Sequence, residues 1–271
     1  MKLVSFETSD GARRAGALDG DEISVLDVPD MRTLFERGLD PAAAAAASSE
    51  RVALADVRLC APIVPKKFFH TSGNFREHEE ESKVVGWSHE IAPWIVFFQN
   101  VDAIIGKPGR HFDAHEAASY IAGYTIFNDI TARDIQRREM RSGVFSFCKA
   151  IDTFCPLGPW IVTPDEVGDP HDLEMRLRVN GELRQESHSG NMSVTIAEII
   201  AHYSALGYSA GDIISTGTVS GVAGFRENAA EMYLRPGDVV ECEIEKIGTL
   251  SNPVISWEQA YGVPAPPLQR W

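Results

Sequence analysis

A carboxylate, a guanidinium and an amide follow one another closely after an apolar run in the middle of the chain. Asp129, Arg133 and Gln136 are four and three residues apart, so a helix beginning here would place them on one face. Such a set can bind a metal ion, a substrate carboxylate and a polar substituent together. The alternative is a solvated helix start with local pairing, and spacing alone favours that alternative. Thr131 and Asp134 also have the spacing of a capping box, with Asp in place of Glu.

Two further groups could take part in proton transfer or charge stabilisation. His78 and Glu81 are three residues apart, so in a helical turn the carboxylate could orient the imidazole as a base that activates water. The alternative is a solvated acidic stretch with an incidental His, which the surrounding charges favour. Lys149 is surrounded by apolar residues and must reach water or find an anionic partner such as an enolate or a carboxylate. Reaching water is the commoner outcome.

A glycine-rich loop at 216–224 follows an apolar strand, and its backbone N–H groups could bind a carboxylate. The alternative is an ordinary tight loop. It has neither the GK[ST] ending of a P-loop nor GxGxxG spacing, which argues against nucleotide binding. The chain also has no GxSxG and no HExxH motif, which disfavours serine hydrolases and zinc proteases.

The overall charge restricts the possible partners. The 271 residues carry a formal net charge of −14, which disfavours nucleic acid and anionic membrane surfaces. An anionic substrate therefore needs a local group of Lys or Arg. There is no signal peptide pattern and no apolar run of about 20 residues. The four cysteines form no CxxC pair, which indicates buried free thiols in a reducing compartment. We therefore expect a soluble, cytoplasmic protein.

The hydrophobic pattern predicts a mainly β, α+β protein. Short alternating strands within residues 1–57 predict a small β-rich N-terminal domain, with an alanine run as a surface connector, and residues 58–271 form the larger domain. Asn180-Gly181 predicts a two-residue hairpin turn because both residues tolerate positive φ. Helical patterns are clear at Ala114–Ala122 and Val194–Leu206.

Taken together, these segments resemble the fumarylacetoacetate hydrolase family, in the family's order and over roughly residues 58–258. The similar stretches are Gly73-Asn74-Phe75 with His78 and Glu81, residues 123–136 (GYTIFNDITARDIQ), Lys149, residues 152–160 (DTFCPLGPW), Val179-Asn180-Gly181-Glu182 with Gln185, residues 211–222 (GDIISTGTVSGV) and Pro236-Gly237-Asp238. One stretch alone would be weak evidence, but the ordered set is specific.

The resemblance implies a rolled, mixed β-sheet, a homodimer and a site for Mg²⁺ or Mn²⁺. By position, Asp129 would be a metal ligand and Lys149 would stabilise charge beside it. Thr218 would bind the carboxylate of a 2-oxo acid. Arg133 and Gln136 would bind the far end of the substrate. His78 with Glu81 would activate water, on a segment that closes as a lid in relatives.

One departure concerns the metal ligands. Relatives carry a Glu-x-Glu pair on a strand shortly before the helix that leads to GYT, whereas here VDAIIG runs directly into KPGR. VDAIIG resembles the start of a preceding loop, so roughly 25 residues, including a central strand, are missing between Gly106 and Lys107. We favour a segment lost from the sequence over a true shortening, because losing a core strand should exceed a domain's spare stability. The spacing of Asp102, Asp113 and Glu116 does not identify them as replacements.

The resemblance implies a metal-dependent hydrolase that cleaves an acylpyruvate, fumarylpyruvate or maleylpyruvate and releases pyruvate. An isomerase or decarboxylase of unsaturated 2-oxo dioic acids from aromatic catabolism is the alternative within the enzyme class, because the same metal-enolate chemistry serves both. The His78–Glu81 pair favours hydrolysis. The alternative of another class is a metal-free, catalytically silent protein that kept the fold.

Overall fold

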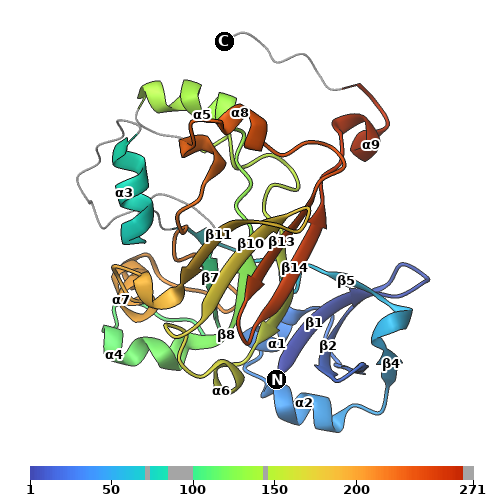
Figure 1. Cartoon of the computed structure of the whole chain (residues 1–271). Coiled ribbons are helices and arrows are strands. Elements are labelled where there is room, and N and C mark those ends of the chain that lie inside the picture. Colours follow the sequence, from blue (N-terminus) through green and yellow to red (C-terminus); the bar gives the residue numbers. More distant parts are fainter. Residues whose placement is uncertain (71–73, 85–99, 143–145, 265–271) are drawn as a thin grey trace.

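The computed structural model describes residues 1–70, 74–84, 100–142 and 146–264. These residues form one ten-stranded sheet, one four-stranded sheet and short helices around them (Figure 1). The predicted α+β, mainly β architecture with a mixed sheet is confirmed. No helix in these ranges is long and apolar enough to cross a membrane.

The ten-stranded sheet runs through the whole molecule. Its order is β4-β3-β2-β1-β9-β8-β7-β12-β6, with β5 also paired to β1. Its strands are β1 (Lys2–Glu7), β2 (Arg13–Asp19), β3 (Glu22–Val25), β4 (Arg51–Ala53), β5 (Arg58–Cys60), β6 (Phe68–Phe69), β7 (Asn100–Ile105), β8 (Ile121–Phe127), β9 (Leu157–Val162) and β12 (Ile213–Ile214). The N-terminal strands are continuous with the rest, because Lys2 and Leu3 of β1 pair with Val162 and Ile161 of β9. Only the β12–β6 pair is parallel among the described pairings.

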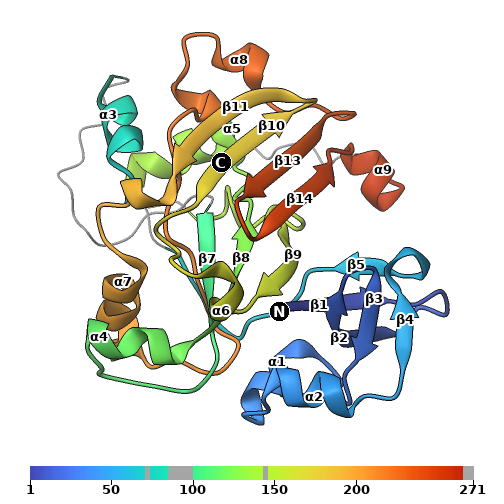
Figure 2. The same cartoon turned by 60° about the horizontal axis from the view of Figure 1, so that its bottom comes forward.

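The smaller sheet packs against the part of the large sheet that contains β8 and β9 (Figure 2). Its order is β11-β10-β13-β14, formed by β10 (Glu174–Val179), β11 (Glu182–His188), β13 (Val239–Ile244) and β14 (Gly248–Pro253). Asn180 and Gly181 join β10 to β11 with φ of 52° and 80°. The predicted hairpin is therefore present, and it uses the two left-handed residues that such a turn requires.

The helices are short. They are α1 (Met31–Glu36), α2 (Pro41–Ala47), α3 (Arg76–Val84), α4 (Ala114–Ala117), α5 (Arg133–Glu139), α6 (Pro164–Val167), α7 (Ile196–Tyr203), α8 (Ala229–Met232) and α9 (Trp257–Tyr261). The alanine run forms α2, which begins where the Asp40 carboxylate accepts the Ala43 N–H at 2.7 Å. The helix predicted for Ala114–Ala122 is shorter in the structure, because β8 already begins at Ile121.

The main hydrophobic core lies between the two sheets and α7. It includes Val101 and Ala103 of β7, Ile126 of β8, Ile200 of α7 and Val240 of β13, all buried. A second cluster, with Leu3, Leu34, Ile104 and Ile213 among its members, packs on the other face of the large sheet around α1. The β7–β8 region therefore has packed apolar layers on both faces, which fixes the ends of these strands.

β7 lies between β8 and β12 in the large sheet. The segment VDAII, predicted to resemble a loop, forms β7 and pairs with β8 on one side and β12 on the other. Val101, Ala103 and Ile105 face one core cluster and Ile104 faces the other. The segment expected to resemble a loop is therefore a strand in the structure, and it supplies both backbone hydrogen bonds and packing beside β8. The expectation that a segment is missing between Gly106 and Lys107 stays a prediction.

Gly123 of β8 gives a test of how closely β8 and β9 pack. A Cβ at this position would lie 2.5 Å from Ile161 Cγ2 and 2.6 Å from the Val162 carbonyl oxygen. We expect Gly123→Ala to lower the free energy of unfolding by roughly 1–3 kcal/mol through overpacking, measured by urea unfolding. The control is Gly38→Ala, where φ is +61° and no atom lies within 4 Å, so only backbone strain of about 1 kcal/mol is expected. Equal losses for both variants would contradict the packing argument.

Candidate active site

A buried ion pair between Asp129 and Lys149 lies just beyond the end of β8. Lys149 Nζ donates to Asp129 Oδ2 and, at 2.8 Å, to Thr131 Oγ1. The two charged side chains are 0% and 6% exposed. The chain after β8 is held in place because Asn128 N–H donates to the Pro156 carbonyl at 2.9 Å. Lys149 therefore pairs with an anionic side chain, Asp129, and does not extend to water.

Burial opposes both charges of this pair. It raises the pKa of Asp129, an effect that the charge and hydrogen bond of Lys149 counteract. It also lowers the pKa of Lys149 to about 8, against the opposing effect of Asp129. Each charge therefore depends on the other, and removing one side chain leaves the other charge buried without a counter-ion.

Arg133 and Gln136 lie together at the start of α5. The Arg133 guanidinium donates to Gln136 Oε1 at 2.7 Å, and burial lowers the pKa of Arg133. The predicted capping box is wrong: Ala132 is the N-cap, with no side-chain cap, and the Thr131 hydroxyl accepts from Lys149 instead. The Thr131 hydroxyl therefore takes part in a tertiary contact with Lys149 and does not cap the helix.

His78 and Glu81 share one face of α3, as their spacing predicts. His78 Nδ1 lies 3.4 Å from Glu81 Oε2, and the His78 ring contacts the Phe225 ring with centroids 5.3 Å apart. Both Glu81 oxygens accept the Gly221 N–H, at 3.2 and 3.1 Å. The carboxylate is therefore fixed from the glycine loop and can orient the imidazole.

The glycine loop does bind a carboxylate through its backbone, but the carboxylate belongs to Glu81. Gln185 of β11 braces the loop by donating to the carbonyls of Val219 and Ser220 at 3.1 and 3.0 Å. Thr218 is buried in this loop, and its hydroxyl donates to the Val219 carbonyl at 3.3 Å. The structure thus places Thr218 inside the loop without a described contact to the Asp129–Lys149 pair.

Asn74 and Asp102 are parts of this region that sequence reasoning missed. Asn74 connects the start of the α3 segment to two other segments, donating to the Val194 and Thr216 carbonyls at 2.9 and 3.0 Å. Asp102 lies in the middle of β7 and is fully buried. Burial raises the pKa of Asp102 well above its usual value, the Ser215 hydroxyl opposes this, and the charge of Asp129 adds to it. An acid in an otherwise apolar strand was the available signal.

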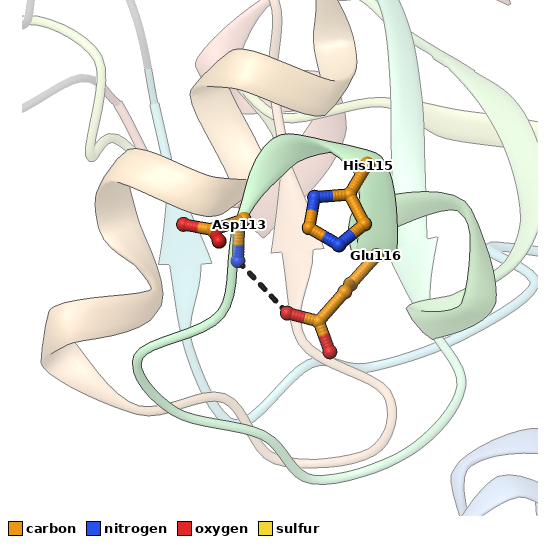
Figure 3. Close-up of side chains that lie close together, drawn as sticks. All are labelled: Asp113, His115 and Glu116. Atoms are coloured by element: carbon orange, nitrogen blue, oxygen red, sulfur yellow. Dashed lines mark hydrogen bonds between the residues drawn. The ribbon is translucent and has the colours of Figure 1, made fainter.

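A second acidic group lies on the surface, away from these residues. Among the described residues, Asp113, His115 and Glu116 are the one set of three potential ligands whose ligand atoms lie close together (Figure 3). All three are exposed, and the Asp113 N–H donates to Glu116 Oε2 at 3.1 Å at the start of α4. The local structure explains this group as the capping of a helix end.

The cysteines near the site are not activated nucleophiles. Burial raises the pKa of Cys148 to about 12, and partial desolvation raises that of Cys155 to about 11. Cys148 and Cys242 are buried, whereas Cys60 is half-buried and Cys155 is exposed, so the expectation of buried thiols is wrong for these last two. The nucleophilic form of cysteine is the thiolate, which is scarce at neutral pH under these conditions. A thiol-based mechanism therefore finds no support here.

The sequence matches a known family over most of its length. The family profile described as Fumarylacetoacetate (FAA) hydrolase C-terminal matches residues 100–255, and a profile described as Rv2993c-like, N-terminal, matches residues 1–62. The chain belongs to the fumarylacetoacetate hydrolase family. The predicted division between residues 57 and 58 stays a prediction.

Relatives from this family are enzymes with different reactions. The mitochondrial oxaloacetate tautomerase of Xenopus laevis is 33% identical over 94% of this chain and 90% of its own length. A 2,4-didehydro-3-deoxy-L-rhamnonate hydrolase of Sphingomonas sp. (strain SKA58) is 43% identical over 57% of this chain, which spans about half (53%) of that relative. The structure of maleylpyruvate hydrolase from Sphingobium sp. SYK-6 has a TM-score of 0.74, with 28% identity over 94% of this chain and 99% of its own.

The alignment with the Xenopus relative spans 301 positions, more than the 271 residues of this chain, so that relative has residues that this chain lacks.

The buried ion pair predicts a specific pattern of stability. We expect Lys149→Met to lower the free energy of unfolding by roughly 3–5 kcal/mol at pH 7, where Lys149 is charged, because it leaves Asp129 buried without a counter-ion. The loss should shrink at lower pH, where Asp129 takes up a proton. Asp129→Asn combined with Lys149→Met should recover most of it. Urea unfolding in EDTA measures the stability of the wild type, of Lys149→Met and of the double variant at each pH. A loss below about 1 kcal/mol for Lys149→Met alone would contradict the pairing.

The raised thiol pKa of Cys155 predicts slow alkylation. At pH 8 we expect iodoacetamide to modify Cys155 more than ~10-fold more slowly than an unperturbed thiol, with the rate rising about tenfold per pH unit as thiolate forms. Peptide mass spectrometry of timed samples gives the rate. Cys155→Ser should retain activity, whereas loss of activity together with fast alkylation would show an activated cysteine.

Proposed function

We propose that this chain is a divalent-metal-dependent hydrolase that cleaves a C–C bond in a small diketo acid, of the acylpyruvate, fumarylpyruvate or maleylpyruvate type, and releases pyruvate. The observation that carries this proposal is the position of Arg133. Its guanidinium interacts electrostatically with both Asp129 and Glu81, and it lies 5.9 Å from the centre of the Phe225 ring that also contacts His78. Groups suited to bind an anion and to activate water therefore surround one centre.

The residues at Asp129 suit Mg²⁺ or Mn²⁺. Oδ2 of Asp129 accepts from Lys149, whereas Oδ1 is buried and has no hydrogen-bond partner within the described ranges. Such an oxygen suits a hard cation, which binds through one or two carboxylates together with water and substrate oxygens. When bound, the ion would supply Lewis-acid stabilisation of the negative charge that forms on the 2-oxo group.

The chain's own residues supply the remaining steps. Lys149 holds Asp129 in position and adds positive charge beside the pyruvate fragment. Arg133 and Gln136 bind the far end of the substrate, and Thr218 its 2-oxo-acid carboxylate. With Nδ1–H of His78 donated to Glu81, His78 Nε2 takes the proton from the water that attacks the distal carbonyl. The C–C bond then breaks with its electron pair going to the pyruvate fragment, and the proton held by His78 passes to the carbon of that fragment, which leaves as pyruvate. Lys149 and Arg133 form the local basic group that the −14 net charge makes necessary.

Isomerisation is the second candidate, and the Xenopus relative, an oxaloacetate tautomerase, favours it. An isomerase or decarboxylase of unsaturated 2-oxo dioic acids from aromatic catabolism would use the same stabilised enolate. It would need Asp129, Lys149 and Arg133 as hydrolysis does. It would not need a water attack supported by His78. The two candidates therefore differ at α3 rather than at the buried ion pair.

The setting of the enzyme is part of the same proposal. We propose a cytoplasmic homodimer that acts on a small 2-oxo acid and binds neither nucleic acid nor membranes. The acidic composition supports this choice of partner. Light scattering of the purified chain would measure the oligomeric state.

A substrate panel with matched variants separates hydrolysis from isomerisation. Acetylpyruvate, fumarylpyruvate, maleylpyruvate and oxaloacetate are supplied with Mg²⁺ or Mn²⁺, while pyruvate release and enol absorbance are followed. For hydrolysis we expect His78→Asn to reduce kcat for pyruvate release by roughly 10²–10⁴-fold, because it removes the base. Asp129→Asn should abolish both pyruvate release and any change in enol absorbance.

The possible outcomes of this panel distinguish hydrolysis from isomerisation. Pyruvate release that survives His78→Asn would contradict the water-activating role. Enol conversion without pyruvate would favour the isomerase. Thr249→Ser, at an exposed position of β14, is the control variant and should leave pyruvate release and enol absorbance unchanged.

A further inference from the structure

Asp102 is a carboxylic acid at a place in the fold where acids are rarely found. It lies in the interior of β7, paired with Thr125 of β8, and β12 covers the other edge of the strand. Its sequence neighbours Val101 and Ala103 are fully buried, as is Asp102 itself. A carboxyl group in such surroundings is costly unless something else in the site compensates it. No packing role explains an acid here in place of an apolar residue.

Asp102 and Asp129 together present three buried carboxylate oxygens for which the described residues provide no hydrogen-bond donor of good geometry, although the Ser215 hydroxyl stabilises the charged form of Asp102. Neither oxygen of Asp102 accepts a hydrogen bond of good geometry from the described part of the chain, and neither does Asp129 Oδ1. The two carboxyl groups lie in the same part of the fold, because β7 pairs with β8 and Asp129 follows the end of β8 by two residues, and the charge of Asp129 acts on Asp102. Lys149 already compensates one of the two charges through Asp129 Oδ2. The oxygens that remain are of the type that hard divalent cations bind.

We propose that Asp102 supplies the second carboxylate of the divalent-cation site, with Asp129 Oδ1 as the other. This inference rests on the metal dependence in the proposed function and adds a ligand that the sequence pattern did not identify. It assigns a role to the one ionisable side chain in the interior of β7. It also explains how a site that sequence reasoning left with a single carboxylate could hold its ion, because Mg²⁺ and Mn²⁺ sites commonly use one or two carboxylates.

Titration with Mn²⁺ tests the assignment by binding rather than by activity. The full chain is freed of metal with EDTA, and free Mn²⁺ is then measured by electron paramagnetic resonance as the ion is added. We expect one Mn²⁺ per chain for the wild type. Asp102→Asn should weaken its affinity by at least the roughly 10–100-fold that loss of an outer-shell partner costs, because a direct ligand is removed. Asp129→Asn should weaken it at least as much.

Two controls keep the result interpretable. His115→Ala removes a potential ligand of the exposed group at the start of α4 and should leave the affinity unchanged, which separates the buried site from surface binding. Thermal melting in EDTA checks folding. We expect Asp102→Asn to melt at or above the wild-type temperature without metal and to lose the upward shift that Mn²⁺ gives the wild type. Should this variant fail to fold, Asp102→Ser provides the same comparison.

The outcomes separate this inference from the proposal beneath it. Wild-type affinity in Asp102→Asn, with binding lost in Asp129→Asn, would overturn the role of Asp102 and leave the metal-dependent function standing. No Mn²⁺ bound by the wild type would overturn both. Binding lost only in His115→Ala would assign the ion to the surface and would also overturn both.

Discussion

The buried ion pair between Asp129 and Lys149 is the constraint on which the rest of the site depends. Because burial disfavours both charges, the structure must hold the two side chains within hydrogen-bond distance. That requires the end of β8, the segment carrying Lys149 and the strand leading from Pro156 to be fixed relative to one another. The packed core layers on both faces of the large sheet provide this rigidity. The stability of the buried ion pair therefore depends on β8 keeping its position.

The parts of the site that could be predicted from sequence are those set by local geometry. His78 and Glu81, and likewise Arg133 and Gln136, are three residues apart, and a single helical turn brings each pair together. The Asn180-Gly181 turn was equally local, because two residues with positive φ define it. In each case the sequence contained both partners within a few residues, so spacing was sufficient.

The parts that could not be predicted depend on contacts between distant segments. Glu81 is held by the N–H of Gly221, 140 residues away, and Lys149 captures the hydroxyl of Thr131 that a local rule assigned to a helix cap. Asp102 was visible as an acid within an apolar run. Its importance depends on β7 lying beside β8, which no spacing along the chain reveals. Tertiary pairing therefore decided what local propensity left open.

β7 illustrates that the backbone pairing of a strand and the identity of its side chains are separate constraints. A strand joins a sheet through backbone hydrogen bonds, so any apolar segment of suitable length and alternation can occupy the position between β8 and β12. The side chains that enter the site from that strand are not constrained by the same bonds. The fold has a TM-score of 0.74 to a maleylpyruvate hydrolase, and β7 carries an acid, Asp102, opposite Thr125 of β8. Similarity of fold therefore does not by itself give the chemistry, which depends on the side chains that the strands bring to the site.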